Sequence, residues 1–361
     1  MKNNIDIKCL ILGIATIAAF QYKGNALLSN ALVSTSGITL TALLFFVTLV
    51  MIFAVVRHAD ALAHKLGEPY GTLILTLSVV LLEVAMICSV MLTGSQNPVM
   101  ARDTMFAVVM AVMNGLVGIT LLIGGVKYHS QRYNVQGLKA YIGAIIPVVT
   151  ICLVLPNFVT SGANGGLTSI MAMTLIATSI LLYGVFLFVQ TKSHTEYFIS
   201  ECDETEEETH ETKSVAYHSV FLVAFLTTVI GLAKSLAIPI DTSITTLGAP
   251  SALGGLIVAL IILSPEGVGA IKAALNNQLQ RAMNLFYGSV LATISLTVPA
   301  VLMIGIMMGE TVILGLAPAD MVLLGATLMV SIVTFSSGKT HPLNGVTHLV
   351  LFMAYVLLMF N

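Results

Sequence analysis

The sequence predicts an all-α integral membrane protein with eleven transmembrane helices, arranged as two inverted five-helix repeats after an extra N-terminal helix. Of its 361 residues, 57% are hydrophobic and only 9% are charged. A soluble domain carries about 25% charged residues, so this chain cannot form a water-exposed surface of ordinary polarity. Its apolar runs are about 20 residues long, as a membrane-spanning helix requires, whereas an outer-membrane barrel needs alternating segments of about 10 residues.

Eleven apolar runs follow one another, and we expect helices at about 9–22, 37–56, 71–93, 104–125, 138–157, 167–190, 215–236, 251–271, 282–304, 319–337 and 343–360. The first is the weakest, because Lys2 and Lys8 precede a short apolar stretch in the manner of a signal peptide. We keep it as a helix, since no convincing cleavage site follows. The four cysteines show no paired spacing and support neither a disulfide framework nor a thiolate metal site.

The distribution of Lys and Arg predicts the orientation. With eleven spans the connections alternate between the two sides of the membrane. One side holds only Lys23, Arg102 and Lys234. The other collects Lys2, Lys8, Arg57, Lys65, Lys127, Arg132, Lys139, Lys192, Lys213, Lys272, Arg281 and Lys339. Under the positive-inside rule, the N-terminus is cytoplasmic and the C-terminus lies outside. In a bacterium, this orientation corresponds to an inner membrane protein with a periplasmic C-terminus.

The one strongly hydrophilic block divides the chain into segments. We expect an N-terminal helix and loop at 1–36, a first five-helix repeat at 37–192, an acidic cytoplasmic linker at 193–214 and a second repeat at 215–361. Because five is odd, the second repeat crosses the membrane in the opposite sense, an arrangement common among secondary transporters. The linker contains seven acids between Glu201 and Glu211. They lack the spacing of an EF-hand loop, so a solvated linker is favoured over a Ca²⁺ sensor.

Two glutamates lie within apolar runs, at corresponding places in the two repeats. Glu83 and Glu266 each belong to the second helix of a repeat, and each follows a similar phrase, Leu66-Gly67-Glu68-Pro69 or Leu247-Gly248-Ala249-Pro250. A carboxylate at membrane depth is costly and typically marks an ion or proton pathway. We therefore predict that Glu83 and Glu266 form one cation- and proton-binding site near the membrane midplane. The alternative for each is a structural acid, protonated and hydrogen-bonded between helices.

The neighbouring residues add possible ligands. Ser264-Pro265-Glu266-Gly267 places a proline and a glycine beside the acid, which frees backbone groups that can bind a hard cation. Small and polar pairs follow in the next helices, Asn114-Gly115 and Gly288-Ser289. The supporting candidates are Thr76, Ser78, Asn114, Ser264, Gly288, Ser289 and Thr293. For each hydroxyl alone, a helix-to-helix hydrogen bond is the commoner role.

Two carboxylates in a low-dielectric interior explain how exchange is possible. Their mutual repulsion and desolvation favour protonation, whereas a bound cation compensates both negative charges. The site therefore holds either protons or a cation, and rarely both. This competition predicts exchange driven by the proton gradient.

The remaining motifs exclude other chemistry. His58, His64 and His129 are assigned to cytoplasmic loops, and His341 and His348 to the start of the last helix. Capping or interfacial roles are favoured for them over proton sensing, although each could titrate near neutral pH. The sequence has no H-E-x-x-H, Walker loop, G-x-S-x-G or dinucleotide fingerprint, so an ATP-driven pump is not expected.

At the glutamate segments the sequence resembles the calcium/proton exchanger family of the cation/calcium antiporter superfamily, and in particular its bacterial ChaA-type branch. The resemblance spans nearly the whole chain. The matching stretches include Val56-Arg57-His58-Ala59-Asp60, Leu82-Glu83-Val84, Leu263-Ser264-Pro265-Glu266-Gly267, Gln280-Arg281-Ala282-Met283-Asn284 and Ser337-Gly338-Lys339-Thr340. It implies that Glu83 and Glu266 are the central cation and proton ligands. It also implies export of Ca²⁺ or Na⁺, and possibly K⁺, as protons enter.

One departure from the family concerns the ligand set. The wider family usually has Gly-Asn shortly before each glutamate, where this chain has Val79-Val80-Leu81-Leu82 and Leu263-Ser264-Pro265. A glutamine also often follows Gly-Ser in the second repeat, where this chain has Ala292. Fewer amide oxygens suit Ca²⁺ less well, because it favours six to eight oxygen ligands.

We therefore predict a cation/proton antiporter that works by alternating access. It has inorganic cations, protons and the lipid bilayer as partners, no cofactor and no nucleic-acid partner. A channel or uniporter could use the same acids as a selectivity site. An intramembrane enzyme would require a nucleophile or a metal-ligand set, which the sequence lacks. The preferred cation, the proton stoichiometry and the oligomeric state stay open.

Overall fold

The computed structural model describes residues 3–28, 35–67, 70–93, 98–159, 167–199, 213–250, 252–309 and 311–360. Within these ranges the chain forms eleven long helical segments, each overlapping one of the predicted runs, besides the short 3-10 helix at Thr195–Tyr197. Eight of them are long and apolar enough to cross a membrane. The predicted helical membrane fold is therefore confirmed. The acidic part of the linker, residues 200–212, lies outside the described residues.

The described chain separates into two compact units. Unit 1 takes residues from Met1–Met100 and Glu208–Pro265, and unit 2 from Ala101–Glu207 and Glu266–Asn361. Each unit thus contains helices from both predicted repeats. Because the repeats are defined by sequence correspondence and not by packing, their boundaries stay a prediction.

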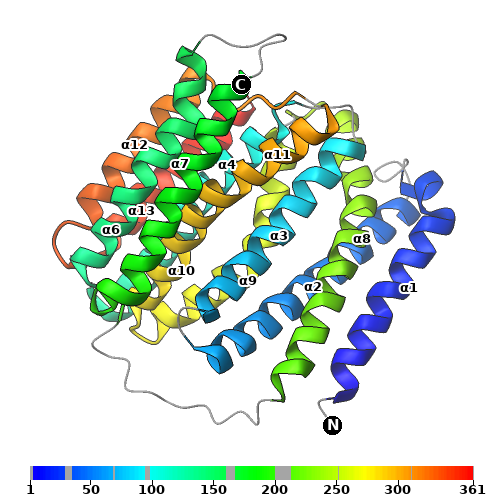
Figure 1. Cartoon of the computed structure of the whole chain (residues 1–361), viewed down its shortest axis with the longest axis horizontal. Helices are drawn as coiled ribbons and strands as arrows, with labels where there is room; N and C mark the ends of the chain where they lie inside the picture. Colours follow the sequence, from blue (N-terminus) through cyan, green and yellow to red (C-terminus); the bar gives the residue numbers. More distant parts are fainter. Residues whose placement is uncertain are drawn as a thin grey trace. The chain divides into compact units, whose positions relative to one another are not determined.

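Unit 1 is built from long helices that pack side by side (Figure 1). They are α1 (Asn3–Leu28), α2 (Thr35–Leu66), α3 (Tyr70–Thr93), α8 (Val215–Leu247) and the first part of α9 (Ala252–Leu275). The first helices of the two predicted repeats, α2 and α8, pack directly on one another, and α3 packs on both. The apolar core between them includes Leu44, Met51, Phe225 and Leu232.

Unit 2 contains the remaining helices, several of which are interrupted by π-helical turns. In chain order it comprises α4 (Met100–Met110), η1 (Ala111–Leu116), α5 (Val117–Tyr128), β1 (Gln131–Arg132), α6 (Val135–Val149), η2 (Thr150–Val154), η3 (Leu155–Phe158), α7 (Ser169–Phe188), η5 (Val189–Ser193), η6 (Thr195–Tyr197), the end of α9, α10 (Leu279–Ala292), η7 (Thr293–Thr297), α11 (Val298–Met308), α12 (Pro318–Thr334), β2 (Lys339–Thr340) and α13 (Pro342–Met359).

The repeated Leu-Gly-x-Pro phrase has the same structural role in both places. Helix α2 ends at Leu66 and helix α8 at Leu247. The glycine that follows each is left-handed, with φ of +64° at Gly67 and +61° at Gly248. A glycine in this conformation is a common helix terminator, and a proline after it prevents the helix from continuing. Each phrase therefore ends the first helix of a predicted repeat just before the helix that carries the glutamate.

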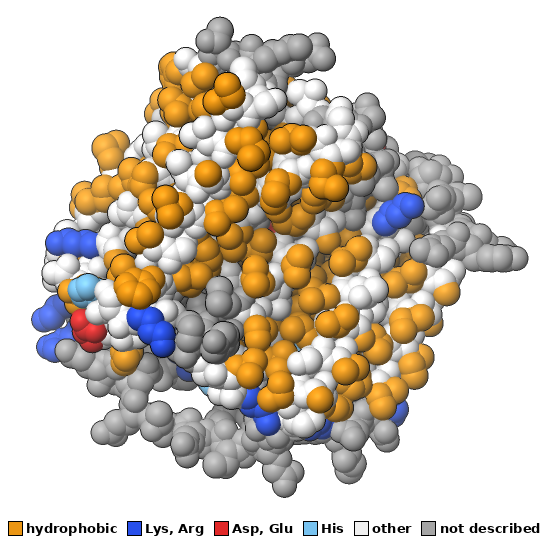
Figure 2. All heavy atoms as spheres, viewed as in Figure 1, with side chains coloured by type: hydrophobic (Ala, Val, Ile, Leu, Met, Phe, Trp, Pro, Cys, Tyr) orange, Lys and Arg blue, Asp and Glu red, His pale blue; other side chains and the backbone are white. Residues whose placement is uncertain are grey.

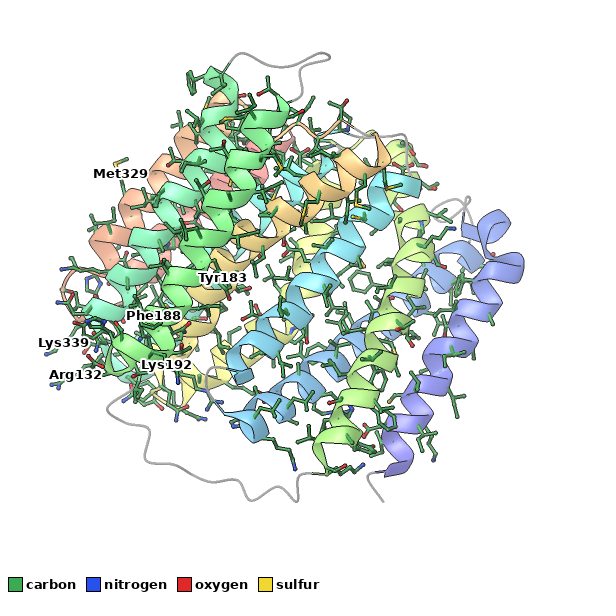
Figure 3. All side chains as sticks on the ribbon, in the orientation of Figure 1. Arg132, Tyr183, Phe188, Lys192, Met329 and Lys339 are labelled. Atoms are coloured by element: carbon green, nitrogen blue, oxygen red, sulfur yellow. The ribbon has the colours of Figure 1, made fainter. Side chains whose placement is uncertain are left out.

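The connections of unit 2 meet at its two ends in the alternation that the sequence predicts. At one end, β1 pairs with β2 through Arg132 and Lys339, and Gln131 Nε2 donates to the Ala274 carbonyl at 2.8 Å. Figure 3 shows Arg132 and Lys339 together with Lys192 at this end. At the other end, Arg102 donates to the Gly315 carbonyl at 3.0 Å. These contacts agree with the predicted separation of Arg102 from the three other basic residues.

The exposed side chains fit a lipid environment. On the face shown in Figure 2, hydrophobic side chains are spread along the helices, and few charged groups lie among them. Strongly exposed apolar side chains include Ile170 on α7, Met307 on α11, and Val322 and Val333 on α12. Outward apolar groups of this kind are expected of helices in contact with hydrocarbon, where exposed charges are costly.

A polar cluster joins α1 to α2 and α8 in unit 1. The Asp6 carboxylate contacts Arg57 at 2.5 Å and accepts a hydrogen bond from the Tyr217 hydroxyl at 2.6 Å. Lys213 lies 3.6 Å from the same carboxylate. His58, which we placed in a loop, is instead buried within α2, with its Nδ1 3.0 Å from Nδ1 of His218. The loop assignment was wrong because α2 continues well past the apolar run that predicted it.

The Asp6 cluster predicts a pH-dependent contribution to the stability of unit 1. Burial raises the pKa of Asp6, but the Tyr217 hydrogen bond and the nearby charges outweigh it, so the pKa lies below its ordinary value of 3.8. The stabilisation is therefore complete above that value and lost as the pH falls through the folded pKa. We expect Asp6→Asn to cost about 1 kcal/mol at pH 7. The difference in thermal unfolding temperature from the wild type should narrow towards pH 3, and a constant difference would contradict this account.

Candidate functional site

Glu83 lies in α3 and is almost completely buried, with 1% of its surface exposed. Two supporting candidates share its helix. Ser78 is buried, and its hydroxyl donates to the Ile74 carbonyl of the previous turn at 2.7 Å. Thr76 is partly buried. A hydroxyl bonded in this way still has lone pairs that can contact a cation, but its proton is used within the helix.

The proline beside Glu266 does not break α9, which continues from Ala252 to Leu275. Pro265 has no N–H group, so the carbonyl of Ile261 lacks its usual helical donor. The Ser264 hydroxyl donates to this carbonyl at 2.7 Å. Ser264 thus partly compensates the proline, because its hydroxyl replaces the missing backbone donor at the Ile261 carbonyl.

Glu266 begins the part of α9 that belongs to unit 2. Its side chain is partly buried, and Oε2 is buried without a hydrogen-bond partner among the described residues. Ser289 on α10 lies close enough to interact with the carboxyl group, and its buried hydroxyl makes no hydrogen bond of ordinary geometry to the residues that the structure describes. Buried oxygens that lack partners are costly. Together they are suited to an added proton or cation.

Two π-helical turns lie at corresponding places in the predicted repeats. The first, η1, interrupts the third helix of the first repeat and contains Asn114; the second, η7, interrupts the third helix of the second repeat and begins at Thr293. Both residues are buried. Insertions of this kind are found frequently at functional sites, because they shift the helical hydrogen-bond ladder. Their matched positions support both the repeat and the prediction that Asn114 and Thr293 belong to the site.

Contacts within unit 2 bring part of the candidate set together. A Cβ atom at Gly267 would lie 3.3 Å from Leu116, so the helix segment carrying Glu266 packs against η1. Gly288 lies beside the ring of Tyr141, where a Cβ would make an ordinary van der Waals contact with the hydroxyl oxygen at 3.6 Å. Thr76, Ser78, Glu83 and Ser264 belong to unit 1.

The Asn114 amide takes part in a buried network that the sequence did not predict. Its Nδ2 donates to the Thr327 hydroxyl at 2.7 Å, and its Oδ1 lies 3.2 Å from Nδ1 of His348. Nε2 of His348 lies 3.2 Å from the Thr334 hydroxyl. His348 is fully buried, so its expected interfacial role was wrong. His341, by contrast, is the N-cap residue of α13, as expected of a capping histidine. The sequence signal that could have revealed this network is His348, a histidine inside an apolar run.

Comparison with known proteins decides the family. The profile described as "Sodium/calcium exchanger protein" matches residues 10–192 and 217–361. The chain belongs to this family. This exchanger is 46% identical over 314 residues to the sodium-potassium/proton antiporter ChaA of Escherichia coli strain K12, covering 85% of each chain. It is 22% identical over 267 residues to the Ca²⁺/H⁺ antiporter ChaA of Bacillus subtilis strain 168, covering 71% of this chain and 75% of the relative.

Solved structures show the same fold. The structure of native YfkE aligns with a TM-score of 0.70 at 18% identity, covering 96% of this chain and 99% of the other. The H⁺/Ca²⁺ exchanger CAX aligns with a TM-score of 0.62 at 12% identity, covering 94% and 88%. The exchanger is therefore a multi-pass membrane protein that carries out cation antiport, and its family is one of transporters and not of enzymes.

Proposed function

We propose that this exchanger moves cations out of the cytoplasm in return for protons, by alternating access at a site built from Glu83 and Glu266. The main supporting observation is that each acid lies in a helix preceded by the same Leu-Gly-x-Pro phrase. The glycine of that phrase, Gly67 or Gly248, ends the previous helix. Glu83 is buried, and a buried Glu266 oxygen has no hydrogen-bond partner within the described part of the chain. Each is thus positioned where binding of a proton or a cation offsets the cost of burying charge.

Exchange follows from competition between the two kinds of ion. A cation needs ionised carboxylates, and a proton neutralises them, so loading one ion releases the other. The cytoplasmic side is proposed as the side of cation uptake, and the inner membrane of a bacterium as the location. Support comes from the distribution of Lys and Arg and from the alternating connections of unit 2.

Na⁺ and K⁺ are proposed ahead of Ca²⁺ as preferred cargo. The 46% identical relative is named a sodium-potassium/proton antiporter, whereas the relative named as a Ca²⁺/H⁺ antiporter is only 22% identical. The ligand chemistry points the same way. The sequence lacks the amides that usually precede the glutamates, and Ca²⁺ favours six to eight oxygen ligands.

The test measures the pH gradient of everted membrane vesicles that contain the exchanger. We expect NaCl and KCl each to dissipate a respiration-generated gradient, with CaCl₂ active at higher concentration or to a smaller extent. Vesicles from cells that lack cation/proton antiporters provide the background. Cation flux that persists without any proton movement would favour the channel or uniporter, and no response to any of the three salts would overturn the proposal.

A further inference from the structure

His348 is held against the η1 turn by a close approach of two helices. A Cβ atom at Gly118 of α5 would lie 3.0 Å from the Gly345 carbonyl of α13. Only residues without a side chain allow backbones to approach this closely, as is common between transmembrane helices. The contact lies one turn before His348, so it brings the fully buried imidazole beside Asn114.

With the Asn114 amide as the structure places it, the hydrogen bonds around His348 have one consistent direction. Asn114 Nδ2 donates to the Thr327 hydroxyl, which leaves Oδ1, an acceptor, facing Nδ1 of His348. Nδ1 must therefore carry the proton. In a neutral imidazole Nε2 is then an acceptor, and it accepts a hydrogen bond from the Thr334 hydroxyl. The Thr327 hydroxyl lies 3.6 Å from the Met110 sulfur, a weak acceptor.

The result is a directed chain of donors from Thr334 through His348 and Asn114 to Thr327. This chain joins α12, α13 and η1. The Asn114 amide takes part through both its nitrogen and its oxygen. Within this chain, reversing any one member alone places two donors or two acceptors face to face, so the members hold one another in orientation. Asn114 is therefore fixed in orientation, together with the π-helical turn that contains it.

We propose that His348 is a positioning residue for cation binding, acting through Asn114 and η1 on the Glu266 half of the site. The link to Glu266 is the contact of Leu116, the last residue of η1, with Gly267. His348 itself does not bind the cation. The proposal rests on the proposed function, since it assigns a role within the same site. The proposal predicts that cation affinity depends on which of the two imidazole nitrogen positions a substituted side chain can still fill with a polar atom.

Two conservative substitutions separate the two nitrogens. The side-chain amide of Asn can place a donor near the position of Nδ1, whereas the longer Gln side chain places its polar atoms near the position of Nε2. We expect His348→Gln to raise the KM for the transported cation about five- to tenfold, the loss of one hydrogen bond that orients a ligand. We expect His348→Asn to stay within about twofold of wild type, with kcat similar in both variants.

A second variant reaches the network from another helix. Thr327→Val removes the acceptor for Asn114 Nδ2 and should also raise the KM for the cation. This variant tests the network independently of whether the His348 variants fold. Thr347→Val is the matched control on α13, because Thr347 is exposed and its hydroxyl only donates to the Asn344 carbonyl. Unchanged KM in both His348→Gln and Thr327→Val, or an equal loss of kcat in both His348 variants, would overturn the positioning role.

The tautomer provides a readout that is independent of transport. In protein labelled with ¹⁵N-histidine, the signal lost in His348→Gln should be that of a neutral imidazole protonated at Nδ1. A proton on Nε2, or on both nitrogens, would overturn the network while leaving the proposed exchange untouched. Conversely, vesicles that show no cation-coupled proton movement would overturn the proposed function without altering the tautomer.

Discussion

Glu83→Gln and Glu266→Gln should each lower proton-coupled cation flux in everted vesicles at least about tenfold. Gln keeps the size of the side chain but has no titratable group and no net charge. An interaction made with a charged group contributes about 1.5–3 kcal/mol, and every 1.4 kcal/mol corresponds to a factor of ten. The variant site resembles a permanently protonated one, so it can neither bind the cation well nor release a proton in exchange.

Controls for the glutamate variants need to separate chemistry from folding. Glu196 is exposed, so Glu196→Gln makes the same chemical change at the surface and should leave transport unchanged. Glu83→Asp and Glu266→Asp retain the charge on a shorter side chain, and each should keep more activity than the matching Gln variant. Because protonated buried glutamates resemble Gln in charge, both Gln variants should remain folded in detergent. Retained proton-coupled cation flux in well-folded Gln variants would contradict the proposal of a two-glutamate site.

The fold could be predicted from the sequence because lipid imposes a simple rule. Backbone polar groups must be satisfied inside each spanning segment, so apolar runs of sufficient length become helices. The helix ends were less predictable. Helix α2 continues to Leu66 through Arg57 and His58, because their polar groups find partners in α1 and α8. Such partners are remote in sequence, and hydropathy alone does not reveal them.

The candidate site was predictable at its acids and less so around them. A glutamate within an apolar run is conspicuous, as at Glu83 and Glu266, and the structure places Ser289, one of the supporting candidates, near Glu266. The roles of hydroxyls depend on local geometry, and Ser264 illustrates this through its bond to the carbonyl that Pro265 leaves without a donor. The His348 network was missed because Asn114 and Thr327 are far apart in sequence and meet only through helix packing. Such contacts follow from tertiary structure and have no local pattern.

The packing that supports this network yields the second prediction of large effect. Gly345→Ala should lower the thermal stability of the exchanger in detergent and reduce transport. A Cβ atom at position 345 would lie 2.5 Å from the Leu122 nitrogen and 2.6 Å from the Gly118 carbonyl oxygen. Both are backbone atoms of α5 and cannot turn aside as a flexible side chain can. Helices α5 and α13 would have to separate, at a cost of about 1–3 kcal/mol for overpacking.

A matched glycine distinguishes this clash from a general effect of substitution. Gly325 lies in α12, and among the described residues no atom beyond its own helix turn comes within 4 Å of a Cβ placed there. Gly325→Ala should therefore be neutral, or stabilising by up to about 1 kcal/mol, because alanine favours the helical backbone. If Gly345→Ala and Gly325→Ala unfold at the same temperature, α13 is not packed against α5 in this way. If only Gly345→Ala is destabilised, loss of transport follows from displacement of α13, which carries His348 away from Asn114.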